Sequence, residues 1–137
     1  MTPLFGYGTF RRPAWRRAIF GVDYPARDAW LHGWRRAALA SGYLTLIRDE
    51  QAAAPAPGVL LDLDDAGWAI ADAWEEVPRY QRLTVRVESS RRQIDAVAYI
   101  APADGAARAL ADDRLAAIED TAVEAAIARF IAAGRRP

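Results

Sequence analysis

The amino-acid sequence predicts one α+β domain, covering residues 1–137, with about six strands. Its 137 residues fit a single domain, and an apolar content of 53% is enough to bury a core. Segments with the period of a strand occur together with segments that have the period of a helix. The chain contains no internal repeat and no linker-like segment that would divide it.

The N-terminal half contains most of the expected strands. An apolar run at residues 4–10 contains two glycines and is followed by a proline, which predicts a short strand that ends in a tight loop. Residues 13–20 form a short helix, since proline is tolerated in the first turn, and Gly21 ends it. Further strands are expected at residues 29–39, with a bulge or close packing at Gly33, at residues 43–47, and at residues 58–63 after a surface loop over residues 48–57.

The second half begins with a helix that leads into a strand. Asp64 and Asp65 start this helix, because short acidic side chains cap free N–H groups, and it runs to about Glu75 or Glu76 before Pro78.

The C-terminal third is expected to contain a hairpin and a second amphipathic helix. Residues 80–88 alternate between two faces and return through a polar turn at residues 89–92 as the strand 93–100. From residue 106 onward, helical spacing predicts a helix that ends at Gly134. Its apolar stripe consists of Leu115, Ile118, Ala122, Val123, Ala126, Ile127, Phe130 and Ile131.

The composition excludes several classes of function. Eighteen basic residues balance eighteen acidic ones, so no net charge would attract nucleic acid or a membrane surface. All the basic residues are arginine, which excludes a lysine Schiff base and a P-loop lysine. The absence of cysteine excludes disulfides, thiolate catalysis and cysteine metal sites. The one histidine, His32, cannot form a His-rich metal site, and any Ser-His-Asp triad would have to use it.

The sequence also carries no sign of membrane insertion or secretion. No apolar run reaches the length of a membrane span, and the N-terminus lacks a charged region followed by an apolar core. We therefore expect a cytoplasmic protein.

The loop at residues 6–10 is the first candidate site. Gly8 lacks a Cβ atom, so a ligand can approach main-chain N–H groups there, and Thr9 adds a hydroxyl. This loop could bind an anion or a carboxylate, but short Gly-x-Gly patterns are also common in ordinary strand-to-turn junctions. Taken alone, the stretch favours the ordinary junction.

The second candidate is the carboxylate pair at Glu75 and Glu76. Here the end of a helix places an acid beside aromatic residues, and a strand then opens with Tyr80 and Arg82 on one face. A carboxylate among Trp and Tyr side chains loses solvation, which raises its pKa toward the range that a general base or acid needs. The alternative is a solvated pair of glutamates at a helix end.

Considered together, these segments resemble the γ-glutamylcyclotransferase-like family, in particular its γ-glutamylamine cyclotransferase and plant avirulence-induced-protein-like branch. In that family a strand ends in Tyr-Gly-Thr/Ser, and a later Asp-x-x-Glu is followed by Tyr-x-Arg and a strand. Tyr7-Gly8-Thr9, Asp72-x-x-Glu75 and Tyr80-Gln81-Arg82 match these motifs in order and spacing over residues 4–88. The family usually has Gly after the catalytic Glu, where this chain has Glu76.

The resemblance implies a small mixed β-barrel of about six strands flanked by helices. It also implies a reaction that converts a γ-glutamyl amine or peptide to 5-oxoproline and a free amine, without a metal or other cofactor. The implied site consists of Glu75 as general base and acid, the substrate-binding residues Tyr7, Gly8, Thr9, Phe10 and Tyr80, and Gly6 and Arg82 as further possible members. Arg82 has an equal claim to being a structural ion-pair residue.

Two other functions fit the same residues. One is a binding module that holds a small γ-glutamyl or amino-acid ligand without turnover. The other is removal of a γ-glutamyl protecting group in a biosynthetic pathway. In each case the expected partner is a small molecule and not nucleic acid or a membrane, and the protein is expected to be a monomer or a homodimer.

Overall fold

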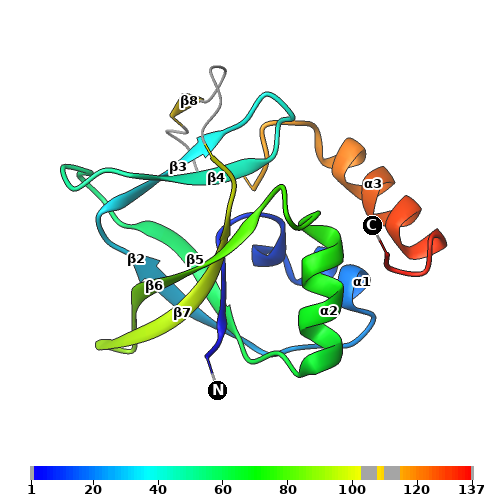
Figure 1. The fold of residues 1–137 in the computed structure, drawn as a ribbon, viewed down its shortest axis with the longest axis horizontal. Coiled ribbons are helices and arrows are strands. Elements are labelled where there is room, and N and C mark those ends of the chain that lie inside the picture. The colour runs from blue at the N-terminus through cyan, green and yellow to red at the C-terminus, as the bar shows by residue number, and fades with distance from the viewer. Residues whose placement is uncertain (1, 103–107, 110–114, 137) are drawn as a thin grey trace.

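The computed structural model describes residues 2–102, 108–109 and 115–136 of the chain. Figure 1 shows a β-barrel with helices α1, α2 and α3 gathered on one side of it. The strands are β1 (Leu4–Gly6), β2 (Ala26–Leu31), β3 (Trp34–Ala38), β4 (Leu44–Arg48), β5 (Ala56–Leu61), β6 (Gln81–Ser89), β7 (Arg92–Ile100) and β8 (Arg108–Ala109). The helices are the 3-10 helix η1 (Thr9–Arg11), α1 (Pro13–Phe20), α2 (Asp65–Trp74) and α3 (Asp120–Ala132).

Five strands close the barrel in the order β1-β5-β2-β6-β7. Neighbouring strands are antiparallel, except that β1 and β7 pair in parallel at Leu4 and Val97. A second sheet, in the order β4-β3-β8, lies beside the barrel (Figure 1). The small mixed barrel flanked by helices is thus confirmed, with eight strands in the described part of the chain where about six were expected.

The longest strands, β6 and β7, form the hairpin that their alternation predicts. Ser90 and Arg91 make its two-residue turn, and both have a positive φ, at 51° and 63°. Such mirror-image turns match the twist of the strands that they join. On the strand face that carries Leu83, Val85 and Val87, the two valines are buried, whereas Leu83 is 45% exposed.

The single strand predicted over residues 29–39 is wrong, because the chain turns sharply within it. His32 and Gly33 form this turn, and Gly33 has a φ of 81°, which glycine adopts without a steric cost. The residues before the turn belong to β2 in the barrel, and those after it belong to β3 in the second sheet. The glycine therefore marks a change of sheet and not a bulge.

The surface loop predicted over residues 48–57 is three residues too long, because Arg48 is the last residue of β4. Ala56 and Pro57 already belong to β5 and lie opposite Leu31 and Trp30 of β2. Proline is tolerated at this position because β1 pairs only with the later part of β5, so the strand has one free edge here.

The C-terminal helix begins later than its apolar stripe predicts. Helix α3 starts at Asp120, so Leu115 and Ile118 precede it, although both pack against the core beside the helices. A hydrogen bond of 2.6 Å from the N–H of Ala117 to the carbonyl of Gly42 holds this segment in a non-helical path. Between residues 106 and 114, the structure describes only the two residues of β8.

Two apolar clusters hold these layers together. One joins the barrel strands to the β3–β4 pair and includes the fully buried Phe5, Leu60 and Val87. The other joins the barrel to the three helices and includes Ile19 and Val123. Residues 4–10 contribute to both clusters, Phe5 and Tyr7 to the first and Leu4 and Phe10 to the second, so this segment lies between the barrel and the helices. No helix in the described residues has the length and apolarity that crossing a bilayer requires.

Candidate active site

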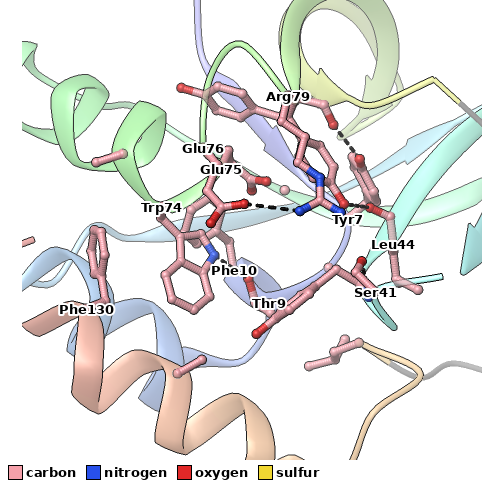
Figure 2. A pocket seen from close by; sticks show the side chains of 18 of the residues that line it. Tyr7, Thr9, Phe10, Ser41, Leu44, Trp74, Glu75, Glu76, Arg79 and Phe130 are labelled. Carbon is pink, nitrogen blue, oxygen red and sulfur yellow. Dashed lines mark hydrogen bonds and ion pairs between the residues drawn. The ribbon is translucent and has the colours of Figure 1, made fainter. Parts of the chain in front are cut away.

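A cavity of about 420 Å³ lies where the barrel meets α2 and α3. Its walls come from four main segments, which are residues 4–10, residues 41–44, residues 73–80 and the C-terminal half of α3 with the residues after it. The sequence-predicted residues that line this cavity are Gly6, Tyr7, Gly8, Thr9, Phe10, Glu75 and Tyr80. Figure 2 shows how the first and third segments face one another across this space.

The loop after β1 lines the cavity and contains main-chain N–H groups from which no described turn or loop carbonyl accepts a hydrogen bond. The chain leaves β1 at Gly6 and turns at once into η1; a Cβ at Gly6 would lie only 2.9 Å from the Cβ of Phe10. The first N–H groups of a helical turn have no partner within it. Among the described residues, no turn or loop carbonyl accepts a bond from the N–H of Gly8, Thr9 or Phe10. These groups can therefore bind a carboxylate or an oxyanion.

Thr9 also connects this loop to the end of α2. Its hydroxyl accepts a hydrogen bond of 3.1 Å from Nε1 of Trp74. Helix α2 itself begins where the sequence predicts, because the side chain of Asp64 accepts a bond of 2.8 Å from the N–H of Gly67. The helix ends at Trp74, and Glu75 caps it by donating its N–H to the carbonyl of Ala71.

Glu75 is the C-cap residue of α2 and lies directly in the cavity wall. The residue is half-buried, with its carboxyl group surrounded by protein atoms. Burial raises the pKa of Glu75 to about 8, and the neighbouring charge of Glu76 adds to this rise. A carboxyl group with such a pKa both accepts and donates a proton near neutral pH.

Glu76 differs from Glu75 in both exposure and conformation. Its side chain is 62% exposed and forms an ion pair of 3.4 Å with Arg79 (Figure 2). Its backbone has a φ of 56°, in the left-handed region. The buried carboxylate of the pair is therefore Glu75.

The two tyrosines that the sequence predicts for the site, Tyr7 and Tyr80, are held by backbone carbonyls. Tyr7 donates a hydrogen bond to the carbonyl of Tyr99, and Tyr80 donates one of 2.8 Å to the carbonyl of Leu44. Burial, followed by the charge of Glu75, raises the pKa of both Tyr7 and Tyr80 well above its usual value, so both phenols stay neutral. Each hydroxyl oxygen retains the capacity to accept a bond from a ligand.

Arg82 does not line this cavity but pairs with Asp72 of α2. Two parallel hydrogen bonds of 2.9 and 2.8 Å join its guanidinium to the Asp72 carboxylate. The guanidinium also lies 4.5 Å from the ring centre of Trp68, and Tyr99 donates a bond of 2.5 Å to Asp72. This geometry favours the structural ion pair over a site role.

The comparisons with known proteins bear on the same residues. The family model for gamma-glutamyl cyclotransferase, AIG2-like, matches residues 4–120. The chain belongs to this family. The match includes the β1 loop and Glu75, and it supports a cyclotransferase-type enzyme in general terms. No curated protein sequence matches the chain.

Solved structures of other proteins share the fold of this gamma-glutamyl cyclotransferase-like chain. The solution structure of At5g39720.1 from Arabidopsis thaliana has a TM-score of 0.64 and 22% identity, over 76% of this chain and 72% of that chain. That of At3g28950.1 from Arabidopsis thaliana has a TM-score of 0.62 and 21% identity, over 98% and 79%. The crystal structure of YkqA from Bacillus subtilis has a TM-score of 0.57 and 21% identity, over 75% and 41%.

The cyclotransferase-like cavity also contains residues that the sequence did not single out for the site. Tyr43 and Trp74 meet edge to face, with ring centres 6.4 Å apart, and Trp74 meets Phe130 of α3 in the same way at 5.3 Å. Arg79 and Arg129 add positive charge to the lining. Only Trp74 gave a local signal, since it adjoins Glu75, whereas the others enter the cavity through tertiary packing.

The described residues contain no cluster of metal ligands. Across residues 2–102, 108–109 and 115–136, no three His, Cys, Asp or Glu side chains gather closely enough to hold a metal ion.

Proposed function

We propose that this chain is a γ-glutamyl cyclotransferase that converts a γ-glutamyl amine or peptide to 5-oxoproline and a free amine. The observation that supports this most directly is the location of Glu75, whose pKa is raised to about 8, in the same cavity as the N–H groups of the β1 loop. General acid–base chemistry on an anionic substrate needs both features.

The substrate carries its own nucleophile in this reaction. The α-amino nitrogen attacks the γ-carbonyl carbon, a C–N bond forms, and the bond to the leaving amine breaks. Since the two reacting groups are tethered, holding the glutamyl chain in its ring-closing shape supplies much of the rate advantage. A chain without cysteine or lysine can carry out such a reaction.

Glu75 moves one proton in this scheme. Its carboxylate accepts a proton from the attacking nitrogen, and the resulting carboxylic acid returns that proton to the leaving nitrogen. Atoms balance without water, because the leaving amine gains the hydrogen that the ring nitrogen loses.

The β1 loop holds the negative charge of the substrate. The N–H groups of Tyr7, Gly8, Thr9 and Phe10 are directed in this proposal to the α-carboxylate or to the oxyanion that develops on the γ-carbonyl. Tyr80 forms a neutral wall beside them, where its oxygen can accept a bond from the substrate amine.

The test is release of 5-oxoproline by the wild type and by Glu75→Gln, across γ-glutamyl amines, γ-glutamyl amino acids and glutathione. Glu75→Gln should stay folded and lose about 10²–10⁴-fold in kcat, the usual contribution of a general acid–base group. Glu76→Gln is the matched control and should keep most of the activity. Full activity of Glu75→Gln would refute the assigned base, and ligand-induced stabilisation without any product would favour a binding module.

A further inference from the structure

Helix α3 and the residues that follow it form one wall of the cavity. Ala126, Arg129 and Phe130 of this wall lie on one face of α3, and Ala133 and Arg136 follow the helix. The family match ends at residue 120, where α3 begins, so membership of the family does not account for this wall.

A continuous path leads from the β1 loop to this wall. Thr9 bonds Trp74 at 3.1 Å, and the ring of Trp74 meets that of Phe130 with centres 5.3 Å apart. Figure 2 shows Phe130 beyond Trp74 on the α3 side of the cavity. A substrate held by the loop, with its γ-carbonyl near Glu75, would therefore extend its leaving group along these two rings.

The wall carries positive charge without a carboxylate partner in the part of the chain that the structure describes. Arg12, Arg79 and Arg82 are each paired with an acid, at 2.8, 3.4 and 2.8 Å respectively. No such ion pair joins Arg129 or Arg136 to an Asp or Glu among the described residues, although both line the cavity.

We propose that this wall binds the leaving amine, and that the substrate is a γ-glutamyl conjugate of an apolar α-amino acid, preferably an aromatic one. Its side chain would lie against Trp74 and Phe130, and its carboxylate would bind Arg129 and Arg136. A cavity of about 420 Å³ has room for such a group in addition to the glutamyl end. This inference rests on the proposed function, because that function assigns the glutamyl end to the loop.

Three conjugates separate the two features of the wall. γ-Glutamylphenylalanine has both the ring and the second carboxylate, γ-glutamylphenethylamine lacks only that carboxylate, and γ-glutamylalanine lacks only the ring. The wild type should turn over the phenylalanine conjugate with a kcat/KM at least about tenfold above either of the others, since one charge-assisted hydrogen bond is enough for such a factor. Equal kcat/KM for the first two conjugates would overturn the role of the arginines.

Arginine variants test whether Arg129 and Arg136 bind the carboxylate of the leaving group. The double variant Arg129→Gln/Arg136→Gln should lose about tenfold in kcat/KM on γ-glutamylphenylalanine and nothing on γ-glutamylphenethylamine. Arg86→Gln is the matched control, since Arg86 is 69% exposed on β6 and outside the cavity lining. An equal loss on both conjugates would show that the arginines do not bind the leaving group.

Binding to Glu75→Gln separates this inference from the proposed function. Calorimetry on that variant should show tighter binding of γ-glutamylphenylalanine than of γ-glutamylphenethylamine, by a similar factor. If the wild type forms no 5-oxoproline while this preference is present, the proposed reaction fails and the assignment of the wall holds. If 5-oxoproline forms but the preference is absent, the wall assignment fails alone.

Discussion

At the scale of single residues, the protonation of Glu75 depends on Glu76. Burial is the larger cause of the raised pKa of Glu75, and the charge of Glu76 is the second. In the proposed function Glu75 is the general base and must be deprotonated, so kcat/KM should rise with pH and level off above about pH 8. In Glu76→Gln the second charge is gone, so the rising limb should move to lower pH.

Comparing these two pH profiles separates the titration of Glu75 from the titration of the substrate amine. Titration of the substrate amine affects wild type and variant equally, so only a shift between them reports on Glu75. Profiles of kcat/KM between about pH 6 and pH 10 would check this. Superimposable profiles would show that Glu76 does not set the pKa of the catalytic group.

The backbone at Glu76 adopts a conformation that favours glycine. A φ of 56° costs a residue with a Cβ roughly 1–2 kcal/mol, and glycine avoids this cost. Glu76→Gly should therefore be more stable than Glu76→Ala by about 1 kcal/mol, although both remove the same charge. Urea unfolding of the two variants measures the difference, and equal midpoints would contradict the explanation.

At the scale of elements, Asp72 and Arg82 connect α2 to β6. Both side chains are partly exposed, at 37% and 44%, and pairs of this kind contribute about 0.2–1 kcal/mol. Arg82→Gln should lower the free energy of unfolding by about that amount and leave KM unchanged. Arg86→Gln, on the same strand, is the control. A raised KM with unchanged stability would instead place Arg82 against the substrate.

The sequence predicts elements well where a local pattern has only one outcome. Alternation identifies the β6–β7 hairpin, and the capping side chain of Asp64 identifies the start of α2. It fails at Gly33, because a bulge and a change of sheet both need glycine, and the choice depends on which strands are available as partners. It also fails at the start of α3, since apolar residues before the helix pack against the same core in either conformation.

The candidate site also contains some residues that the sequence predicts and others that it does not. The β1 loop and Glu75 lie in short motifs that can be recognised in the sequence, and both line one cavity in the structure. Phe130 and Arg129 have no such motif, because the helical stripe that contains Phe130 is also what an ordinary core helix requires. Only the packing of α3 shows that one of its faces lines the cavity.

At the scale of the whole molecule, Glu75 makes global stability depend on pH. Its pKa is about 8 in the folded protein, against an ordinary value of 4.5. The folded state therefore binds more protons than the unfolded state between these limits, and stability falls as pH rises from about 4.5 to about 8. The free energy of unfolding falls by at most about 1.4 kcal/mol per pH unit. The fall is smaller than this limit because Glu75 is half-buried.

Glu75→Gln should remove this dependence. The free energy of unfolding of the variant should equal that of the wild type near pH 4.5 and exceed it by a growing amount up to about pH 8. Above about pH 8 the difference between the two should stay constant. Urea unfolding of both proteins at several pH values gives the difference, in which all other titrating groups cancel. A constant difference across the whole range would mean that Glu75 is not perturbed by folding.

The closure of the barrel has a consequence for how activity is acquired during folding. Strands β1 and β7 close it in parallel, and across this seam Tyr7 reaches the carbonyl of Tyr99, which is 92 positions away in the chain. Contacts of such long range form slowly, because chain entropy is lost before they stabilise anything. The β1 loop therefore reaches Glu75 only after the N-terminal strand docks, and catalysis should return in the last kinetic phase of refolding, after the helical circular dichroism signal has recovered.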